Sequence, residues 1–248
     1  MWYLFYTGAT LTPEGNVQSV GVAVSEDLRS FTKLPGPILT ADRPYERLTD
    51  GAWHDEAFRD PWVFRDAAGD GWHMLITARV PEGPTYERGV VGHATSPDLR
   101  SWTLREPLSD PGQGFGQLEV MEVVELGGRN FLLFHCLAGD MAPERRDATT
   151  GGSWLAPAES PLGPYDIAGA HQLTDERFYV TRPVRDRETG RQYVMAFRNL
   201  DAGVFGGVLT DPVELVLDDG VPRLVDPTGE WAVRQPSPSG GSDDPGRP

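Results

Sequence analysis

Apolar and polar residues alternate in short runs along most of this chain. Four runs are rich in aromatic residues and are spread over its length, at positions 2–6, 72–76, 131–134 and 193–197. A period of two residues is typical of β-strands, and turns rich in glycine and aspartate, such as 66–71, separate the runs. No window has the sustained period of 3.6 residues that an amphipathic helix needs. The pattern therefore predicts an all-β protein with very little helix.

One motif occurs twice and indicates an internal repeat. The pattern Ser-x-Asp-Leu-Arg-Ser-aromatic-Thr fills positions 25–32 and again 96–103, so that Asp27 and Asp98 are 71 positions apart. The aromatic run in front of each copy repeats with almost the same offset, and two later aromatic runs continue the series. Four units of about 60–70 residues, each with several short strands, indicate a β-propeller with at least four blades.

The charge balance narrows the classes of partner. The chain has 22 lysine and arginine residues against 37 aspartate and glutamate residues, a formal net charge of −15. Such a protein repels nucleic acids and anionic membrane surfaces, so we expect neither as a partner. No run approaches the roughly 18 apolar residues of a membrane-spanning helix. The segment after Met1 lacks the basic region and cleavage site of a signal peptide, which favours a cytoplasmic location.

Composition also suggests the domain limits. We assign residues 1–233 to one propeller domain and expect 234–248, rich in proline, glycine, serine and aspartate, to be a disordered tail. The single cysteine, Cys136, rules out an intramolecular disulfide and stands in an apolar run typical of a buried residue. The five histidines have no metal-binding spacing, so we expect no metal ion and no other cofactor.

The densest group of polar and aromatic residues lies at 53–64. Asp60 stands between Arg59 and Pro61 at the start of a predicted strand. In a propeller the innermost strands start at the central cavity, which would place Asp60 in a pocket with Arg59 beside it. The alternative is a turn aspartate paired with Arg59. Trp53 likewise has two interpretations, because its ring could stack on a sugar or fill the core.

A second group of carboxylates interrupts an apolar run. In a regular strand Glu119 and Glu125 share one face and Glu122 lies on the other. A carboxylate within apolar surroundings has a raised pKa, as a general acid requires. A solvated edge strand would explain the same pattern. Two carboxylates that face one cavity from different blades are suited to glycoside cleavage.

These residues resemble glycoside hydrolase family 32, the fructofuranosidases, invertases and levanases, related to families 43, 62 and 68. The sequence Phe-Arg-Asp-Pro at 58–61 is similar to the family's Arg-Asp-Pro motif, and 117–121 resembles its Glu-Cys-Pro region. Val120 and Met121 replace the usual Cys and Pro, but Glu119 is kept. The resemblance covers nearly all of 2–230 and implies a propeller of the five-bladed type.

The resemblance also implies roles for individual residues. Glu119 would be the general acid/base, and Asp60 would stabilise the transition state by binding sugar hydroxyls. The expected substrate-binding residues are Arg59, Trp53 and Phe58. The substrate would be a fructoside such as sucrose or a fructan, cleaved by a retaining mechanism.

One departure from the family pattern affects the expected activity. The family's nucleophile is an aspartate on the first strand of the first blade, whereas positions 2–8 resemble the second blade. We therefore expect blades two to five here, without that nucleophile, and hydrolysis near background; Asp55 and Glu122 are the first substitutes to consider. If a blade is missing, we expect one of three outcomes: a gap in the ring, self-association through that gap, or closure into a narrower ring.

Two alternative functions remain open at this point. The chain is a non-catalytic carbohydrate-binding propeller if the pocket persists without its nucleophile. It is a furanosidase acting on arabinose or xylose units if it has the three-carboxylate site of the related families.

Overall fold

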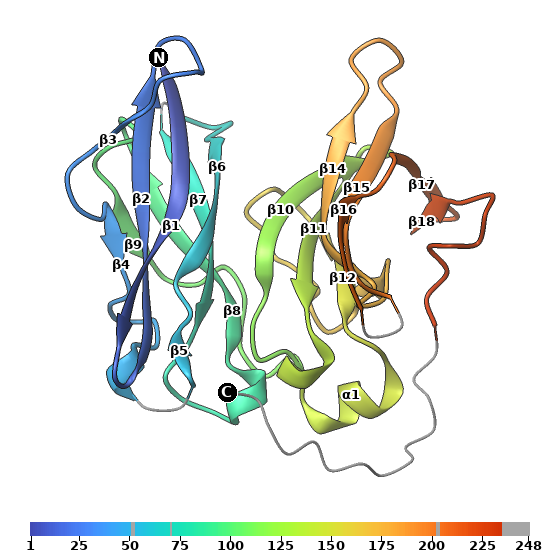
Figure 1. Ribbon diagram of the computed structural model, residues 1–248, viewed down its shortest axis with the longest axis horizontal. Helices are drawn as coiled ribbons and strands as arrows, with labels where there is room; N and C mark the ends of the chain where they lie inside the picture. The colour runs from blue at the N-terminus through green and yellow to red at the C-terminus, as the bar shows by residue number, and fades with distance from the viewer. Residues whose placement is uncertain (51–52, 70, 202–203, 235–248) are drawn as a thin grey trace.

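The structure is a computed structural model that describes residues 1–50, 53–69, 71–201 and 204–234. The alternating runs form strands that gather into four sheets along the chain (Figure 1). The all-β prediction is confirmed: the described helical elements are one short helix, α1 (Pro143–Ala148), and three single 3-10 turns. No helix in the described part is long and apolar enough to cross a membrane. The predicted tail lies outside the described residues, apart from Arg234.

Three sheets share one four-stranded order. The second sheet is β6 (Arg59–Arg65), β7 (Trp72–Arg79), β8 (Gly89–Ser96) and β9 (Thr103–Arg105). The third is β10 (Glu119–Leu126), β11 (Arg129–Cys136), β12 (Gly152–Ala158) and β13 (His171–Gln172). The fourth is β14 (Phe178–Arg185), β15 (Gln192–Asp201), β17 (Val213–Asp218) and β18 (Val221–Val225), with β16 (Val204–Leu209) also paired to β15. β6, β10 and β14 each lie at one edge of their sheet, and β6 and β10 contact each other across the two sheets; we call these three the innermost strands.

The first sheet departs from this order. It consists of β1 (Trp2–Thr12), β2 (Gly15–Ser25) and β3 (Thr32–Lys33), with β4 (Leu39–Thr40) and β5 (Asp55–Glu56) also paired to β2. The repeat aligns β1 with β7 and β2 with β8, since Trp2 corresponds to Trp72 and Asp27 to Asp98. The described part of the first sheet therefore has no counterpart of the innermost strand β6. Together the four sheets confirm the prediction of a propeller with about four blades.

The hydrophobic core lies between consecutive sheets. Neighbouring residues of a strand point to opposite faces, so in β7 Met74 packs towards the first sheet with Val20, while Leu75 packs towards the third sheet with Leu132. A further cluster between the third and fourth sheets includes Leu133 and Phe178. Figure 1 shows the first two sheets on the left and the last two on the right, with α1 below the third sheet.

The repeated motif folds into the same turn in both copies. After β2, Asp27 Oδ1 accepts hydrogen bonds from the N–H groups of residues 29 and 30, both at 2.8 Å. After β8, Asp98 Oδ1 accepts the corresponding bonds at 2.9 and 2.7 Å. The leucine that follows each aspartate has a positive φ, 61° at Leu28 and 65° at Leu99. The motif is therefore the sequence of a turn that joins the third and fourth strands of a blade.

The three innermost strands share a one-residue bulge. The pairing register shifts after Arg59 in β6, after Glu119 in β10 and after Tyr179 in β14, at intervals of 60 residues. The next residue in each strand has a positive φ of 50–57°. The bulge corrects one prediction: Glu119 pairs with His135 and Glu122 with Leu133, which are two residues apart in β11. Glu119 and Glu122 therefore share a face, because the extra residue breaks the strict alternation.

Candidate active site

The inner ends of two neighbouring blades meet at one arginine. The Arg59 guanidinium group lies 2.6 Å from Glu119 Oε1 and 3.4 Å from Asp60 Oδ2, and Asp55 Oδ2 is 4.0 Å away. The Arg59 side chain is only 12% exposed. Burial disfavours its charge, but Glu119 and Asp60 outweigh that effect and raise the pKa of Arg59. The predicted residues Arg59, Asp60 and Glu119 are thus brought together around one guanidinium group.

Glu119 is the most deeply buried carboxylate of this group. It begins β10 directly before the bulge, and its surface is 6% exposed. Burial raises the pKa of Glu119, and the Arg59 charge opposes this rise without cancelling it. Its second oxygen, Oε2, is buried and has no hydrogen-bond partner among the described residues. Glu119 therefore has one oxygen held by Arg59 and one that makes no hydrogen bond within the described residues.

Asp60 occupies the bulge position itself, with a φ of 57°. Thr77 Oγ1 donates to Asp60 Oδ2 at 3.0 Å, and the Asp60 N–H donates to Thr7 Oγ1 at 3.0 Å. The Asp60 side chain is 22% exposed, more than that of Arg59 or Glu119. Asp60 is therefore fixed by backbone and side chain while it stays accessible to a ligand.

Arg59 is held in place by hydrogen bonds to polar residues that the sequence did not point to. Its guanidinium donates to Gln117 Oε1 at 2.6 Å and to Gln18 Oε1 at 3.1 Å. Gln117 in turn donates to Asp140 Oδ2 at 2.8 Å, and Asp140 is buried. These partners come from three different sheets or loops, so no local pattern in the sequence joins them to Arg59.

Tyr179 is a further candidate that the sequence analysis missed. It precedes the bulge of β14, as Arg59 and Glu119 precede the bulges of β6 and β10. Burial, and then the negative charges of Glu119 and Asp60, raise the pKa of Tyr179. Its ring packs edge-on against His135, with 4.4 Å between the centroids. Arg59, Glu119 and Tyr179 share no residue type, so only the bulges in the strand pairing show that the three positions correspond.

The two predicted aromatic ligands have different environments. Trp53 lies over the Arg79 guanidinium, 3.9 Å from its carbon, and edge-on to Tyr86. Arg79 also donates to the carbonyl of Gly116, next to Gln117, so Trp53 is close to the chain that carries the site. The prediction that Phe58 contacts the substrate is wrong, because its ring is fully buried in the core. Phe58 and Arg59 are neighbours on an extended chain, so they point to opposite sides.

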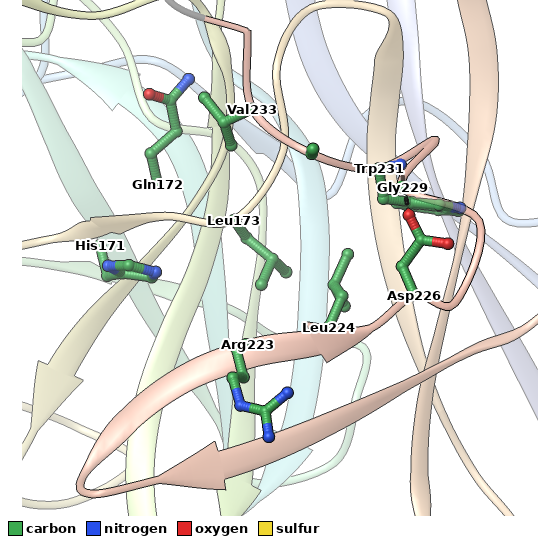
Figure 2. Close-up of a pocket in the computed structure, with 10 residues that line it drawn as sticks. His171, Gln172, Leu173, Arg223, Leu224, Asp226, Gly229, Trp231 and Val233 are labelled. Carbon is green, nitrogen blue, oxygen red and sulfur yellow. Dashed lines mark hydrogen bonds between the residues drawn. The ribbon is translucent and has the colours of Figure 1, made fainter.

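A separate cavity lies at the outer side of the third and fourth sheets. Its volume is about 470 Å³, and it lies between β13, β18 and the segment 229–233. Figure 2 shows Leu173, Leu224 and Trp231 around it, with His171 and Arg223 at its margin. None of its lining residues belongs to the group around Arg59. Across the described part of the chain, no cluster of three or more potential metal ligands is present.

Comparison with known proteins identifies the family. Residues 1–203 match the model of the glycosyl hydrolases family 32 N-terminal domain. The chain belongs to glycosyl hydrolase family 32. The family 32 resemblance inferred from 58–61 and 117–121 is therefore confirmed. No match was found among curated proteins.

Solved structures agree with this family 32 fold. The family 32 β-fructofuranosidase BmSUC1 of Bombyx mori superposes with a TM-score of 0.68 and 20% identity, over 92% of this chain and 48% of that one. An inulosucrase from Halalkalicoccus jeotgali bound to kestose has a TM-score of 0.70 and 24% identity, over 90% and 66%. Sucrose-6-phosphate hydrolase from Lactobacillus gasseri has a TM-score of 0.66 and 16% identity, over 90% and 45%. The chain thus spans about half the length of the first of these proteins.

Proposed function

We propose that this chain carries the acid/base half of a fructosyl hydrolase site. The observation that supports the proposal is the single guanidinium of Arg59, which contacts both Glu119 and Asp60 at the inner ends of neighbouring blades. The structural neighbours include a β-fructofuranosidase mutant in complex with sucrose and an inulosucrase bound to kestose. We therefore assign fructosides as the substrate class.

Each residue has a chemical role in this proposal. Glu119, with its raised pKa, is the general acid that protonates the leaving glycosidic oxygen and then the base that activates water. Asp60 accepts hydrogen bonds from sugar hydroxyls and strengthens them as positive charge develops on the ring. Arg59 holds both carboxylates in place, and the Tyr179 hydroxyl and the Trp53 ring are further sugar contacts.

A second candidate, carbohydrate binding without turnover, has its own support. A retaining mechanism needs an attacking carboxylate about 5–5.5 Å from the acid/base. Asp55 and Glu122, the two residues considered as substitute nucleophiles, each lie beside an arginine. Asp55 Oδ2 is 4.0 Å from Arg59, and Glu122 Oε2 is 2.9 Å from Arg182. A carboxylate held by an arginine is a poor nucleophile, so the 248-residue chain should bind a fructoside and hydrolyse it near background.

The test compares Glu119→Gln with Glu125→Gln, an exposed glutamate of the same strand. Calorimetry with kestose should give saturable binding for the wild type and both variants. In a version lengthened upstream until it hydrolyses sucrose, Glu119→Gln should lower kcat by about 10²–10⁴-fold, and Glu125→Gln should not change it. The wild-type rate should fall as pH rises through the raised pKa of Glu119, since the acid must be protonated.

Two results would contradict the proposal. Unchanged turnover in the Glu119→Gln variant would remove the acid/base role. A wild-type chain that binds no fructoside would leave the substrate class without support, whatever the rate of the lengthened version.

A further inference from the structure

Arg79 is a fully buried arginine that the proposed chemistry does not use. It ends β7 and is 1% exposed, yet its guanidinium reaches three segments that lie apart along the chain. Nε donates to Glu46 Oε2 at 2.8 Å, one amino group donates to the Thr85 carbonyl at 3.0 Å, and the other donates to the Gly116 carbonyl. The main chain adds a fourth bond, since the Glu46 N–H donates to the Arg79 carbonyl at 2.7 Å. The guanidinium plane therefore has one fixed orientation.

The ion pair between Arg79 and Glu46 does not by itself explain why a charge is buried here. A buried ion pair contributes little net stability, because both charges lose their hydration. Glu46 is also shared: its second oxygen accepts from Arg88 at 3.2 Å, so that one buried carboxylate serves two arginines. An apolar side chain would fill the same space without the cost of burying a charge. The property that only a guanidinium provides is a flat, hydrogen-bonded face.

This flat face lies over the ring of Trp53. The ring centroid is 3.9 Å from the Arg79 guanidinium carbon, well within the range of about 6 Å for a cation–π contact. Tyr86 meets the same ring edge-on, with 5.7 Å between the centroids and 81° between the planes. Gly116 adjoins the ring as well, because a Cβ atom at this glycine would lie 3.4 Å from Trp53 Cη2. Trp53 is therefore positioned by ring contacts, and the firmest of them is the immobile guanidinium.

The indole N–H of Trp53 has no hydrogen-bond partner among the described residues, although Nε1 is buried. Buried indole N–H groups normally donate a hydrogen bond, so this donor is available to a ligand. A sugar hydroxyl is such a ligand group, and Trp53 is one of the proposed sugar contacts. Gly116 directly precedes Gln117, the hydrogen-bond partner of Arg59, which places Trp53 beside the segment that carries the site.

We propose that Arg79 is a positioning residue for sugar binding, because its guanidinium holds the Trp53 ring where the ring contacts the sugar. Arg79 touches no sugar itself and acts only through Trp53. The inference rests on the proposed function for the identity of the ligand, whereas the hold of Arg79 on Trp53 does not depend on it. Loss of this hold should weaken sugar binding and leave the chemical step at Glu119 unchanged.

The test compares Arg79→Lys with Arg88→Lys in the 248-residue chain. Both variants keep a positive charge beside Glu46, but of the two arginines only Arg79 stacks on Trp53. Indole N–H signals in a proton–nitrogen NMR spectrum report on each tryptophan separately, and Trp53→Phe identifies the Trp53 signal. Arg79→Lys should shift and broaden that signal, since the ring loses its planar support, and Arg88→Lys should leave it in place. The signals of the other tryptophans show whether the fold is kept.

Calorimetry with kestose measures the consequence for sugar binding. Arg79→Lys should weaken the affinity about tenfold, the effect of misplacing one aromatic contact, and Arg88→Lys should change it by less than about twofold. In a Trp53→Ala background, Arg79→Lys should cause no further loss, because both residues act through one contact. In the lengthened version that hydrolyses sucrose, Arg79→Lys should raise KM about tenfold at an unchanged kcat.

Three results would overturn the proposal. An unmoved Trp53 signal in Arg79→Lys would mean that Arg79 does not hold the ring. A shifted signal with unchanged kestose affinity would mean that the position of the ring does not affect the sugar. An equal loss of affinity in the Trp53→Ala background would mean that Arg79 acts by another route.

A second variant covers the case that Arg79→Lys does not fold. Glu46→Gln removes the charged partner that aligns the guanidinium, so it should shift the same Trp53 signal and weaken kestose binding; no change in either would be equally decisive against the proposal. A wild-type chain that binds no fructoside would contradict the proposed function, and the Trp53 signal would then decide separately whether Arg79 holds the ring.

Discussion

The first and second sheets are two copies of one repeat in different surroundings. Both have the Ser-x-Asp-Leu turn, a tryptophan at the start of the aligned strand, and a threonine at Thr7 or Thr77 that accepts a hydrogen bond from the next blade. They differ in their neighbours. Met74 in the second sheet is fully buried, whereas Leu4, at the equivalent position of the first sheet, is 49% exposed.

This difference shows which properties of a blade depend on its own residues and which depend on the sheets packed against it. The aspartate turns are the same in both sheets because all their hydrogen bonds are local. Burial differs because it depends on a sheet packed against that face. Apolar residues such as Trp2 and Leu4 therefore remain partly exposed on the first sheet. Self-association through that face stays a prediction.

The largest expected contrast is between Met74→Ala and Leu4→Ala. Removing a fully buried side chain of this size leaves a cavity and should lower the free energy of unfolding by about 2–5 kcal/mol. Leu4 is already half exposed, so its removal should cost about 1 kcal/mol or less. Urea denaturation of the two variants and the wild type measures both values. Equal losses would mean that the Leu4 face is covered in solution.

A smaller contrast concerns the two threonines. Thr77 is fully buried, and its hydroxyl accepts from the Val120 N–H and donates to Asp60 Oδ2. Thr77→Val should therefore lower the free energy of unfolding by about 1–3 kcal/mol. Thr7 is exposed, and water can replace its bond to the Asp60 N–H, so Thr7→Val should cost about 0.5 kcal/mol. Thermal unfolding checks the difference, with Thr77→Ser as the control that keeps the hydroxyl. A Thr7→Val loss as large as that of Thr77→Val would show that burial does not set the difference between the two threonines.

The smallest contrast is expected at the aspartate turns, where the two sheets should behave alike. Backbone hydrogen bonds lower the pKa of Asp98 to about 2 and also lower that of Asp27. An aspartate whose pKa is lower in the folded state than its unfolded value of about 3.9 stabilises the fold above that pH. This stabilisation is lost as the pH falls through the folded pKa. Asp27→Ala and Asp98→Ala should therefore lower the urea midpoint equally at pH 7, and less at pH 2. Unequal losses at pH 7 would contradict the view that the turn is a local structure.

Part of the site was predictable from sequence because its residues stand in local patterns. Arg59 and Asp60 are adjacent at the start of a strand, and Glu119 interrupts an apolar run, so each could be identified without knowledge of its neighbours. Tyr179, Gln117 and Asp140 could not be identified in this way. Their link to Arg59 and Glu119 depends on which strands lie side by side at the axis.

The amino-acid sequence by itself determined the strands, the repeat and the aspartate turns, because alternation and turn hydrogen bonds involve residues close along the chain. Only the tertiary structure decided which carboxylates share a face and which aromatic rings reach the site. The bulge that places Glu119 and Glu122 on one side exists only when β10 pairs with β11. Phe58 is buried because its ring packs against Tyr45 in the core between the first two sheets. Such outcomes depend on the register between distant strands, which a period of two residues does not encode.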